Sequence, residues 1–253
     1  MTVNGHAQCR AAQPLAKNFL PASEPVSQAE IASDAHKAYY DEDYHLTYRS
    51  ILLEPEVYES WVEMIDWYYF EEADRNASLF DYGCGFGQAI AGNSKRAGWD
   101  LSAEARGIAR ANGAHVFDSI DRVPRGAWER VYCRHVLEHI EAPLEALKQM
   151  AELLTPNGQL ILVLPREEHI PAPFEPDWSQ HLYCWNFVTI NNLLARAGLR
   201  PTANEQRFPI GWTRLARLRK RLPGKLFRAL VRSGAILRRH GELVIRAERA
   251  STP

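Results

Sequence analysis

The sequence predicts an α/β fold with a mostly parallel sheet, and three observations lead to this fold class. Short apolar runs alternate with helical patterns between residues 77 and 168, which is typical of β-α-β units. The first of these runs, Leu79 to Tyr82, leads directly into a glycine-rich turn. The chain has 253 residues, of which 46% are apolar, so it is long enough to bury a large core. Its longest unbroken aliphatic run, Leu160 to Leu164, is far shorter than the roughly 20 residues of a membrane helix.

The N-terminal part predicts a flexible arm followed by a helical cap. Residues 1 to 33 are rich in Ala, Gln, Ser and Pro without apolar periodicity, and they lack the basic start and apolar stretch of a secretory signal. Residues 34 to 75 are expected to form the cap, with one long helix from Ile51 to Phe70. The apolar residues of that stretch recur at helical spacing: Val57, Trp61, Ile65 and Tyr68.

Residues 76 to 250 are expected to form the main domain. The strands predicted from its apolar runs are, in chain order, Ser78 to Tyr82, Lys95 to Trp99, His115 to Phe117, Arg130 to Cys133, Gln159 to Leu164 and, last, Glu242 to Ala247.

Helices are predicted between these strands. Ser102 is the expected N-cap of one helix, which ends at Asn112-Gly113. Pro143 begins a second helix, and the stretch Thr155 to Gly158 stops it and turns the chain. A third helix is expected from about Val188 to Ala197.

The turn after the first strand carries three glycines at every second position, Gly83, Gly85 and Gly87. Glycine lets the backbone turn tightly and approach a ligand closely, and a helix after the turn would point its amide groups at that ligand. The dinucleotide fingerprint needs G-x-G-x-x-G, whereas this turn reads G-x-G-x-G. The turn therefore predicts a nucleotide-like ligand and disfavours a dinucleotide.

Four segments resemble, in order, motifs of the class I S-adenosylmethionine-dependent methyltransferases. Residues 81–87, DYGCGFG, look like motif I; residues 98–102, GWDLS, are similar to the G-x-D-x-S motif; residues 116–119, VFDS, follow the third strand; and residues 134–140, RHVLEHI, resemble the H-V-L-E-H segment of a small-molecule branch. The resemblance covers Ala77 to Leu199 and implies a Rossmann-like, seven-stranded, mostly parallel sheet with helices on both faces. One departure is that 13 positions separate Gly87 from Asp100, about one helical turn fewer than the family pattern.

The resemblance also implies that S-adenosyl-L-methionine is the cofactor. The residues expected to bind it are Asp81, Gly83, Cys84, Gly85, Gly87, Asp100, Leu101, Asp118, Ser119 and His135. The acid of the second motif holds both ribose hydroxyls in the family, and a carboxylate suits that role because it accepts from two donors at once. Asp118 matches the position that receives the adenine amino group, and His135 the methionine region. Two structural roles stay open: Asp100 as a helix N-cap and Asp81 as a capping group.

Two histidines are candidate catalytic residues, because histidine titrates near neutral pH and can act as a general base. His181 ranks first, since its segment resembles the family's substrate-side H-L-x-x-F segment. His139 ranks second and could instead pack at the start of the Pro143 helix. We expect no metal, because the four cysteines lack paired spacing, and reduced thiols in the cytoplasm.

The net charge of −1 hides two oppositely charged segments. Residues 1 to 72 carry 13 acids and 4 bases, whereas residues 207 to 239 carry 11 Lys or Arg and no acid. Leucines at helical spacing on either side of Pro223-Gly224 predict a basic helical insertion, residues 207 to 240, before the last strand. The insertion could dock on the protein's own body, or attract an anionic substrate, a carrier or a membrane surface. Nucleic acid is a weaker candidate, because residues 134–137 read R-H-V-L where base-methylating enzymes of this fold carry N/D-P-P-Y/F.

Together these patterns predict an enzyme that transfers a methyl group from S-adenosyl-L-methionine to an oxygen, nitrogen or carbon of a small-molecule acceptor. Two alternatives stay open. One is a dinucleotide-dependent oxidoreductase. The other is a cofactor-binding but inactive subunit that serves as an interaction module through residues 207 to 239.

Overall fold

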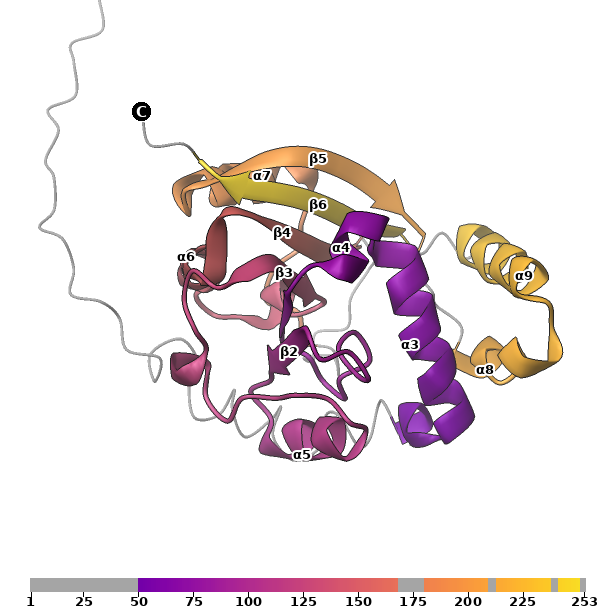
Figure 1. Ribbon diagram of the computed structural model, residues 1–253. Helices are drawn as coiled ribbons and strands as arrows, with labels where there is room; N and C mark the ends of the chain where they lie inside the picture. Colours follow the sequence, from indigo (N-terminus) through magenta and orange to yellow (C-terminus); the bar gives the residue numbers. More distant parts are fainter. Residues whose placement is uncertain (1–49, 168–179, 209–212, 238–240, 251–253) are drawn as a thin grey trace, which may run out of the picture.

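A six-stranded sheet forms the middle layer of the part of the protein that the computed structural model describes, residues 50–167, 180–208, 213–237 and 241–250 (Figure 1). Its order is β2-β1-β3-β4-β6-β5. The strands are β1 (Leu79–Tyr82), β2 (Arg96–Trp99), β3 (Trp128–Arg134), β4 (Leu154–Arg166), β5 (Leu199–Arg207) and β6 (Gly241–Arg249). Strands β2, β1, β3 and β4 are parallel to one another, whereas β6 pairs antiparallel with β4 and β5. The expected arm and the first part of the cap lie outside the described residues.

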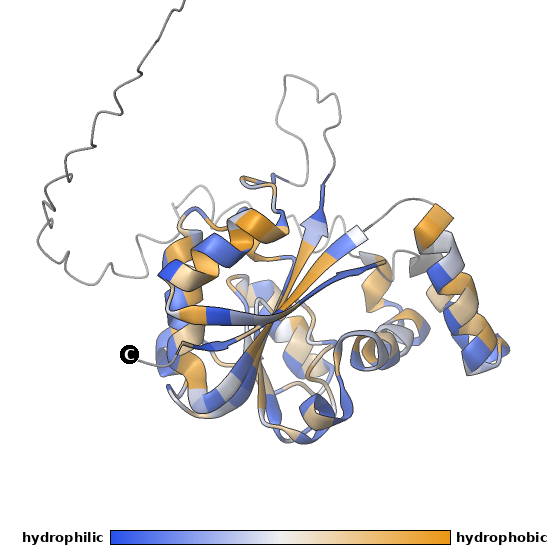
Figure 2. Cartoon of the chain, turned by 90° about the horizontal axis from the view of Figure 1, so that it is seen from above, coloured by the Kyte–Doolittle hydropathy of each residue, from blue (hydrophilic) through white to orange (hydrophobic). Residues whose placement is uncertain are grey.

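Helices cover both faces of this sheet, as the sequence predicts. The described helices are η2 (Ser50–Leu53), α3 (Pro55–Tyr69), α4 (Glu72–Asn76), α5 (Ala103–Ala111), η3 (Ile120–Arg122), η4 (Leu137–His139), α6 (Pro143–Leu153), α7 (Phe187–Arg196), α8 (Thr213–Ala216), η5 (Arg219–Arg221) and α9 (Gly224–Leu237), where η denotes a 3-10 helix. One face carries α6 and α7, and the opposite face carries α3 and α5. The strands at the middle of the sheet contribute hydrophobic residues to both layers (orange in Figure 2), whereas the edge strand β5, LRPTANEQR, is mostly polar.

Local sequence signals account for several helix ends. The Ser102 side chain accepts a hydrogen bond from the backbone N–H of Ala105, 3.1 Å away, and so caps α5. Pro55 and Pro143 occupy the first turns of α3 and α6, where a missing backbone N–H costs nothing. Because Pro55 starts a new helix, the long helix expected from Ile51 begins later and is preceded by η2. Of the helices in the described residues, none has both the length and the apolar composition needed to cross a bilayer.

The third of the strands that we predicted, His115 to Phe117, is not formed in the described residues, and the sheet there has six strands instead of the expected seven. His115 to Phe117 makes a single parallel bridge, between Val116 and Gly98, with two hydrogen bonds of 3.0 and 2.9 Å. The apolar run has only three residues, and Ser119 then caps η3 with its side chain, so the ladder ends after one residue. Through this one bridge the segment lies beside β2. The turn expected at 155–158 is also wrong, since these residues belong to β4, where its register against β3 shifts.

The helix expected after the glycine turn is absent from the described residues as well. Residues 83 to 95 form successive turns instead, with hydrogen bonds from the backbone N–H groups of Ile90 and Ala91 to the carbonyl of Gly87. Eight residues, 88 to 95, lie between Gly87 and the start of β2, and they form turns rather than a regular helix.

The two oppositely charged segments of the sequence meet on the outer side of α3. Arg217 pairs with Glu54, Arg219 with Glu63 at 2.7 Å, and Lys220 with Glu59 at 2.9 Å. Buried apolar residues of the insertion, Phe227 and Val231 among them, pack in the same cluster as α3. In Figure 1, α8 and α9 accordingly lie beside α3, away from the sheet. The basic helical insertion therefore docks on the protein's own body, which is one of the two possibilities that the sequence allows.

Candidate active site

The glycine turn is fixed to the end of β2 by backbone hydrogen bonds. The N–H groups of Gly83 and Cys84 both donate to the carbonyl of Trp99, at 2.8 and 3.0 Å. The next backbone N–H along the chain, that of Gly85, donates to Oδ2 of Asp100 at 2.7 Å. Two motifs that are far apart in the sequence thus form one structural unit at the carboxyl edge of the parallel strands, where open α/β sheets bind ligands.

Two buried carboxyl groups lie in this unit. Asp100 is 7% exposed, and its other oxygen accepts from the backbone N–H of Ser102 at 3.0 Å. Asp81 is 4% exposed, and its negative charge is poorly compensated. Burial, and next the negative charge of Asp100, raise its pKa to about 8. Burial likewise raises the pKa of the Cys84 thiol well above its usual range, so Cys84 is a small neutral residue here. A buried acidic pair of this kind favours a ligand that brings positive charge or hydroxyl donors.

The glycines of the turn are required by the protein's own packing. Gly83 has a φ of 81°, and a Cβ atom there would lie 2.3 Å from Cγ2 of Val136. Gly87 has a φ of 83°, and its Cβ would lie 2.9 Å from that of Ala114. Both positions demand glycine because of the left-handed backbone and because a neighbouring side chain fills the space.

Two expected adenine-side residues have local partners. Asp118 forms an ion pair with Arg110, and its side chain is 67% exposed. The Ser119 hydroxyl accepts a hydrogen bond from the backbone N–H of Asp121 at 3.2 Å, which caps η3. Leu101 is half-buried between Asp100 and the cap of α5. Asp118 and Ser119 therefore lie at the rim of the site rather than within the buried acidic unit.

His135 belongs to a buried ionic network at the end of β3. Its Nε2 lies 2.8 Å from Oε1 of Glu242, which also accepts a hydrogen bond from Arg134 at 2.9 Å, and Tyr69 donates to the second oxygen of Glu242. Burial alone would raise the pKa of Glu242, but the charges and hydrogen bonds of Arg134, His135 and Tyr69 lower it to about 2. The network also holds His135 at a φ of 53°, a left-handed conformation that side chains other than glycine rarely adopt.

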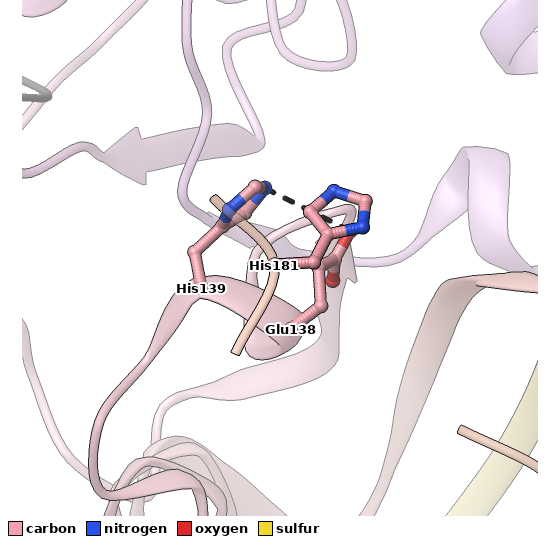
Figure 3. Close-up of side chains that lie close together, drawn as sticks. All are labelled: Glu138, His139 and His181. Atoms are coloured by element: carbon pink, nitrogen blue, oxygen red, sulfur yellow. Dashed lines mark ion pairs between the residues drawn. The ribbon is translucent and has the colours of Figure 1, made fainter. Parts of the chain in front are cut away.

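A second cluster lies where η4 meets the segment after β4, and it contains both candidate catalytic histidines (Figure 3). The rings of His139 and His181 meet edge to face, with centroids 4.7 Å apart. Nδ1 of His181 lies 2.5 Å from a carboxylate oxygen of Glu167. The Glu138 side chain is fully buried beside the two rings, and burial raises its pKa to about 7. Potential ligand atoms of Glu138, His139 and His181 all lie within 4.8 Å of one another.

A protein-family comparison matches residues 59–204 to a family described as "Methyltransferase domain". This chain belongs to that family. The match includes most of α3, the glycine turn, both acidic residues of the buried unit and the histidine cluster.

The chain is also similar to a curated protein and to several solved structures. A curated relative, the ubiquinone biosynthesis O-methyltransferase of Aromatoleum aromaticum, is 31% identical over 118 residues, which is 38% of this chain and about half, 47%, of that relative. Phosphoethanolamine N-methyltransferase 2 of Haemonchus contortus, solved with phosphomonomethylethanolamine and S-adenosylhomocysteine, has a TM-score of 0.56 at 14% identity over 88% of this chain and 61% of its own. The 1,6-didemethyltoxoflavin-N1-methyltransferase of Burkholderia thailandensis has a TM-score of 0.52 at 15% identity over 91% of this chain and 94% of its own. The structural likeness shows a Rossmann-like methyltransferase fold.

Several of the predicted site residues lie close together in the structure. Asp81, Asp100 and the glycine turn come together, and His139 meets His181. Glu167 and Glu242 were missed. No local signal identifies them, because their roles depend on contacts with residues 14 and 107 positions away. Glu138 could have been found, since it lies within the H-V-L-E-H segment.

Proposed function

We propose that this chain binds S-adenosyl-L-methionine at the β1–β2 edge and transfers its methyl group to a small-molecule acceptor, at oxygen, nitrogen or carbon. The observation that carries the proposal is the hydrogen bond from Gly85 to Asp100, which joins the glycine turn and the acidic residue after β2 into one ligand-binding unit. Family membership and the small-molecule substrates in the names of similar proteins support it. We also assign the chain to the branch with an H-V-L-E-H segment, which residues 135–139 match.

The donor set of the site fits this cofactor. S-adenosyl-L-methionine supplies an electrophilic methyl group on a positively charged sulfur, and it presents ribose hydroxyls and an ammonium group. Two buried carboxyl groups, Asp81 and Asp100, are suited to accept those donors and to compensate that charge. In this proposal Asp100 and Leu101 lie at the ribose, Asp118 and Ser119 at the adenine rim, and His135 at the methionine end. The backbone of Gly83, Cys84, Gly85 and Gly87 lies beneath the cofactor.

The acceptor side of the site is the histidine cluster. Glu167 accepts the Nδ1 proton of His181, which leaves the lone pair on Nε2, so His181 can take a proton from an acceptor that arrives protonated. His139 packs against that ring and limits its rotation. The main task of the protein is to hold the nucleophile, methyl carbon and sulfur in line, which is an effect of orientation.

We also propose that the basic helical insertion binds an anionic partner. Three of its cations are paired with α3, so its free charge is smaller than the sequence indicates. Its helix α9 nevertheless exposes Leu226 and Leu230, 49% and 44% exposed, within a segment rich in Lys and Arg. An anionic substrate, carrier or membrane surface would suit that face. Salt-sensitive sedimentation with anionic vesicles, absent with neutral vesicles, tests the membrane form of this proposal. Three described cysteines are free thiols, which fits the reducing cytoplasm that we propose as its location.

Calorimetry with the full chain tests the function. Wild-type protein should bind S-adenosylhomocysteine, and Asp100→Ala should abolish detectable binding, because the change removes the acceptor and releases Gly85. Unchanged affinity of that variant would contradict the assigned site. NADH binding would favour the oxidoreductase alternative, and cofactor binding without turnover on any acceptor would favour the inactive subunit.

A further inference from the structure

The buried carboxylate of Glu138 has no hydrogen-bond partner, which is unusual for an acid inside a protein. Its side chain is 0% exposed, and neither oxygen forms a hydrogen bond. Nδ1 of His135 and Nε2 of His139 each lie 3.9 Å from Oε1, beyond hydrogen-bond distance. An unpartnered buried carboxylate costs free energy, and a cationic ligand bound to it would offset that cost.

We propose that Glu138, His139 and His181 form a binding site for a divalent transition-metal cation. Two imidazoles and one carboxylate are a donor set that suits zinc and related ions, and three protein ligands leave coordination positions for a substrate atom or water. The three side chains come from two separate segments, η4 and the residues before α7, and converge on one point (Figure 3).

A fourth residue supports this assignment. Metal-bound histidines commonly donate their other ring N–H to a carboxylate, which fixes the tautomer and the ring orientation. Glu167 has that relation to His181, since its oxygen lies 2.5 Å from Nδ1 and the lone pair then falls on Nε2. Glu167 itself is held by the thiol of Cys184, at 3.4 Å.

The distances indicate how much the site must contract. Ligand atoms around a tetrahedral zinc ion, each about 2.1 Å from the metal, lie about 3.4 Å apart. The present separations reach up to 4.8 Å, so binding requires an inward movement of about 1 Å, which side-chain rotation can provide. The ion would replace the weak 3.9 Å contacts of Glu138 with direct coordination.

The catalytic consequence rests on the proposed function, whereas the binding itself does not. A bound cation would occupy Nε2 of His181, so the histidine would no longer take the acceptor's proton. The metal would instead contact an acceptor oxygen or nitrogen and favour its deprotonated form. The metal-free protein keeps the histidine as the base, and the loaded protein uses it as a ligand.

Metal titration of the full-length, chelator-stripped protein without cofactor tests the site. Calorimetry with Zn²⁺ should give one ion per chain, whereas Mg²⁺, which prefers oxygen ligands, should bind far more weakly. Co²⁺ should give visible absorption bands of a low-coordinate nitrogen and oxygen site. His181→Gln and Glu138→Gln should remove both signals, and Glu167→Gln should weaken Zn²⁺ binding by roughly 10- to 100-fold, as such supporting carboxylates do.

The matched control is His115→Gln, an exposed histidine at the far edge of the sheet, which should bind Zn²⁺ as the wild type does. Circular dichroism checks that each variant folds. Absence of a stoichiometric Zn²⁺ site in the wild type, or equal affinity in the two ligand variants, would overturn the proposal. Titration of the same samples with S-adenosylhomocysteine keeps the two proposals apart: intact cofactor binding without a metal site rejects only the metal, and the reverse rejects only the cofactor.

Discussion

Replacing Glu242 by Gln should cost the fold more than any other single carboxylate neutralisation at this edge of the sheet. The side chain is 0% exposed and accepts from Tyr69, Arg134 and His135. These partners outweigh the effect of burial and hold its pKa at about 2, against 4.5 for an ordinary glutamate. Glu242 is therefore ionised at neutral pH and compensates the largely buried guanidinium of Arg134, whose side chain is 14% exposed.

The magnitude follows from that difference in pKa. It corresponds to about 3 kcal/mol of stability at neutral pH, at 1.36 kcal/mol for each tenfold change in proton affinity. Removing one partner of a buried ion pair costs about 3 to 5 kcal/mol, so the two arguments agree. Because the folded-state pKa is lowered, this stability is present above pH 4.5 and is lost as the pH falls toward 2. The variant lacks the ionisation, so its deficit relative to wild type should shrink over the same range.

Urea denaturation followed by tryptophan fluorescence, at several pH values between 7 and 3, measures both effects. Glu248→Gln is the matched control on the same strand: Glu248 is 41% exposed and 3.3 Å from Arg200, so its loss should cost below about 1 kcal/mol. A loss below about 1 kcal/mol for Glu242→Gln at pH 7, or a deficit that stays constant in acid, would refute the reasoning.

Three further outcomes are expected. Gly83→Ala should lower the urea midpoint clearly more than Gly92→Ala, because both glycines have positive φ but only the first would place a Cβ 2.3 Å from Val136; equal midpoints would contradict this. Binding of S-adenosyl-L-methionine at pH 7 should release a proton from Asp81, because a cationic ligand lowers its raised pKa, so the calorimetric heat should depend on the buffer; the dependence should be weaker with S-adenosylhomocysteine, whose sulfur is uncharged. Asp118→Ala should weaken cofactor binding by less than about tenfold, since this exposed residue is already ion-paired, and a complete loss would place it deeper in the site than the structure does.

The sequence predicts best those features that depend on neighbours along the chain. The Ser102 cap, the proline start of α6 and the glycine turn need only local backbone chemistry, and all three are confirmed. Several local predictions fail: residues 88 to 95 form turns instead of a helix, residues 155 to 158 belong to β4 instead of a turn, and the three-residue run at 115 to 117 makes only one bridge. Each outcome depends on how the flanking strands pair, which the local sequence does not show.

Contacts between residues that are far apart in the sequence could not be predicted. The acids of α3 and the bases of the insertion are visible as two charged segments, but contacts 156 and 163 positions apart are needed to see that they neutralise each other. Glu242 shows the same limit, because a glutamate at the start of an apolar strand looks solvent-exposed until β6 is paired antiparallel with β4. That pairing places Glu242 opposite Pro165, at the edge where the parallel strands end.

Arg134 connects the two halves of the site electrostatically. Its positive charge lowers the pKa of three buried carboxyl groups, those of Asp81, Glu138 and Glu242. Only Glu242 bonds to it directly, and only Glu242 is held strongly ionised, with a pKa of about 2. For Asp81 and Glu138, burial raises the pKa more than Arg134 lowers it, so the charge of each carboxylate is not fully compensated. Arg134 thus compensates one acid of the three, and each of the other two lies where we propose a cationic ligand, the sulfonium cofactor at Asp81 and a metal ion at Glu138.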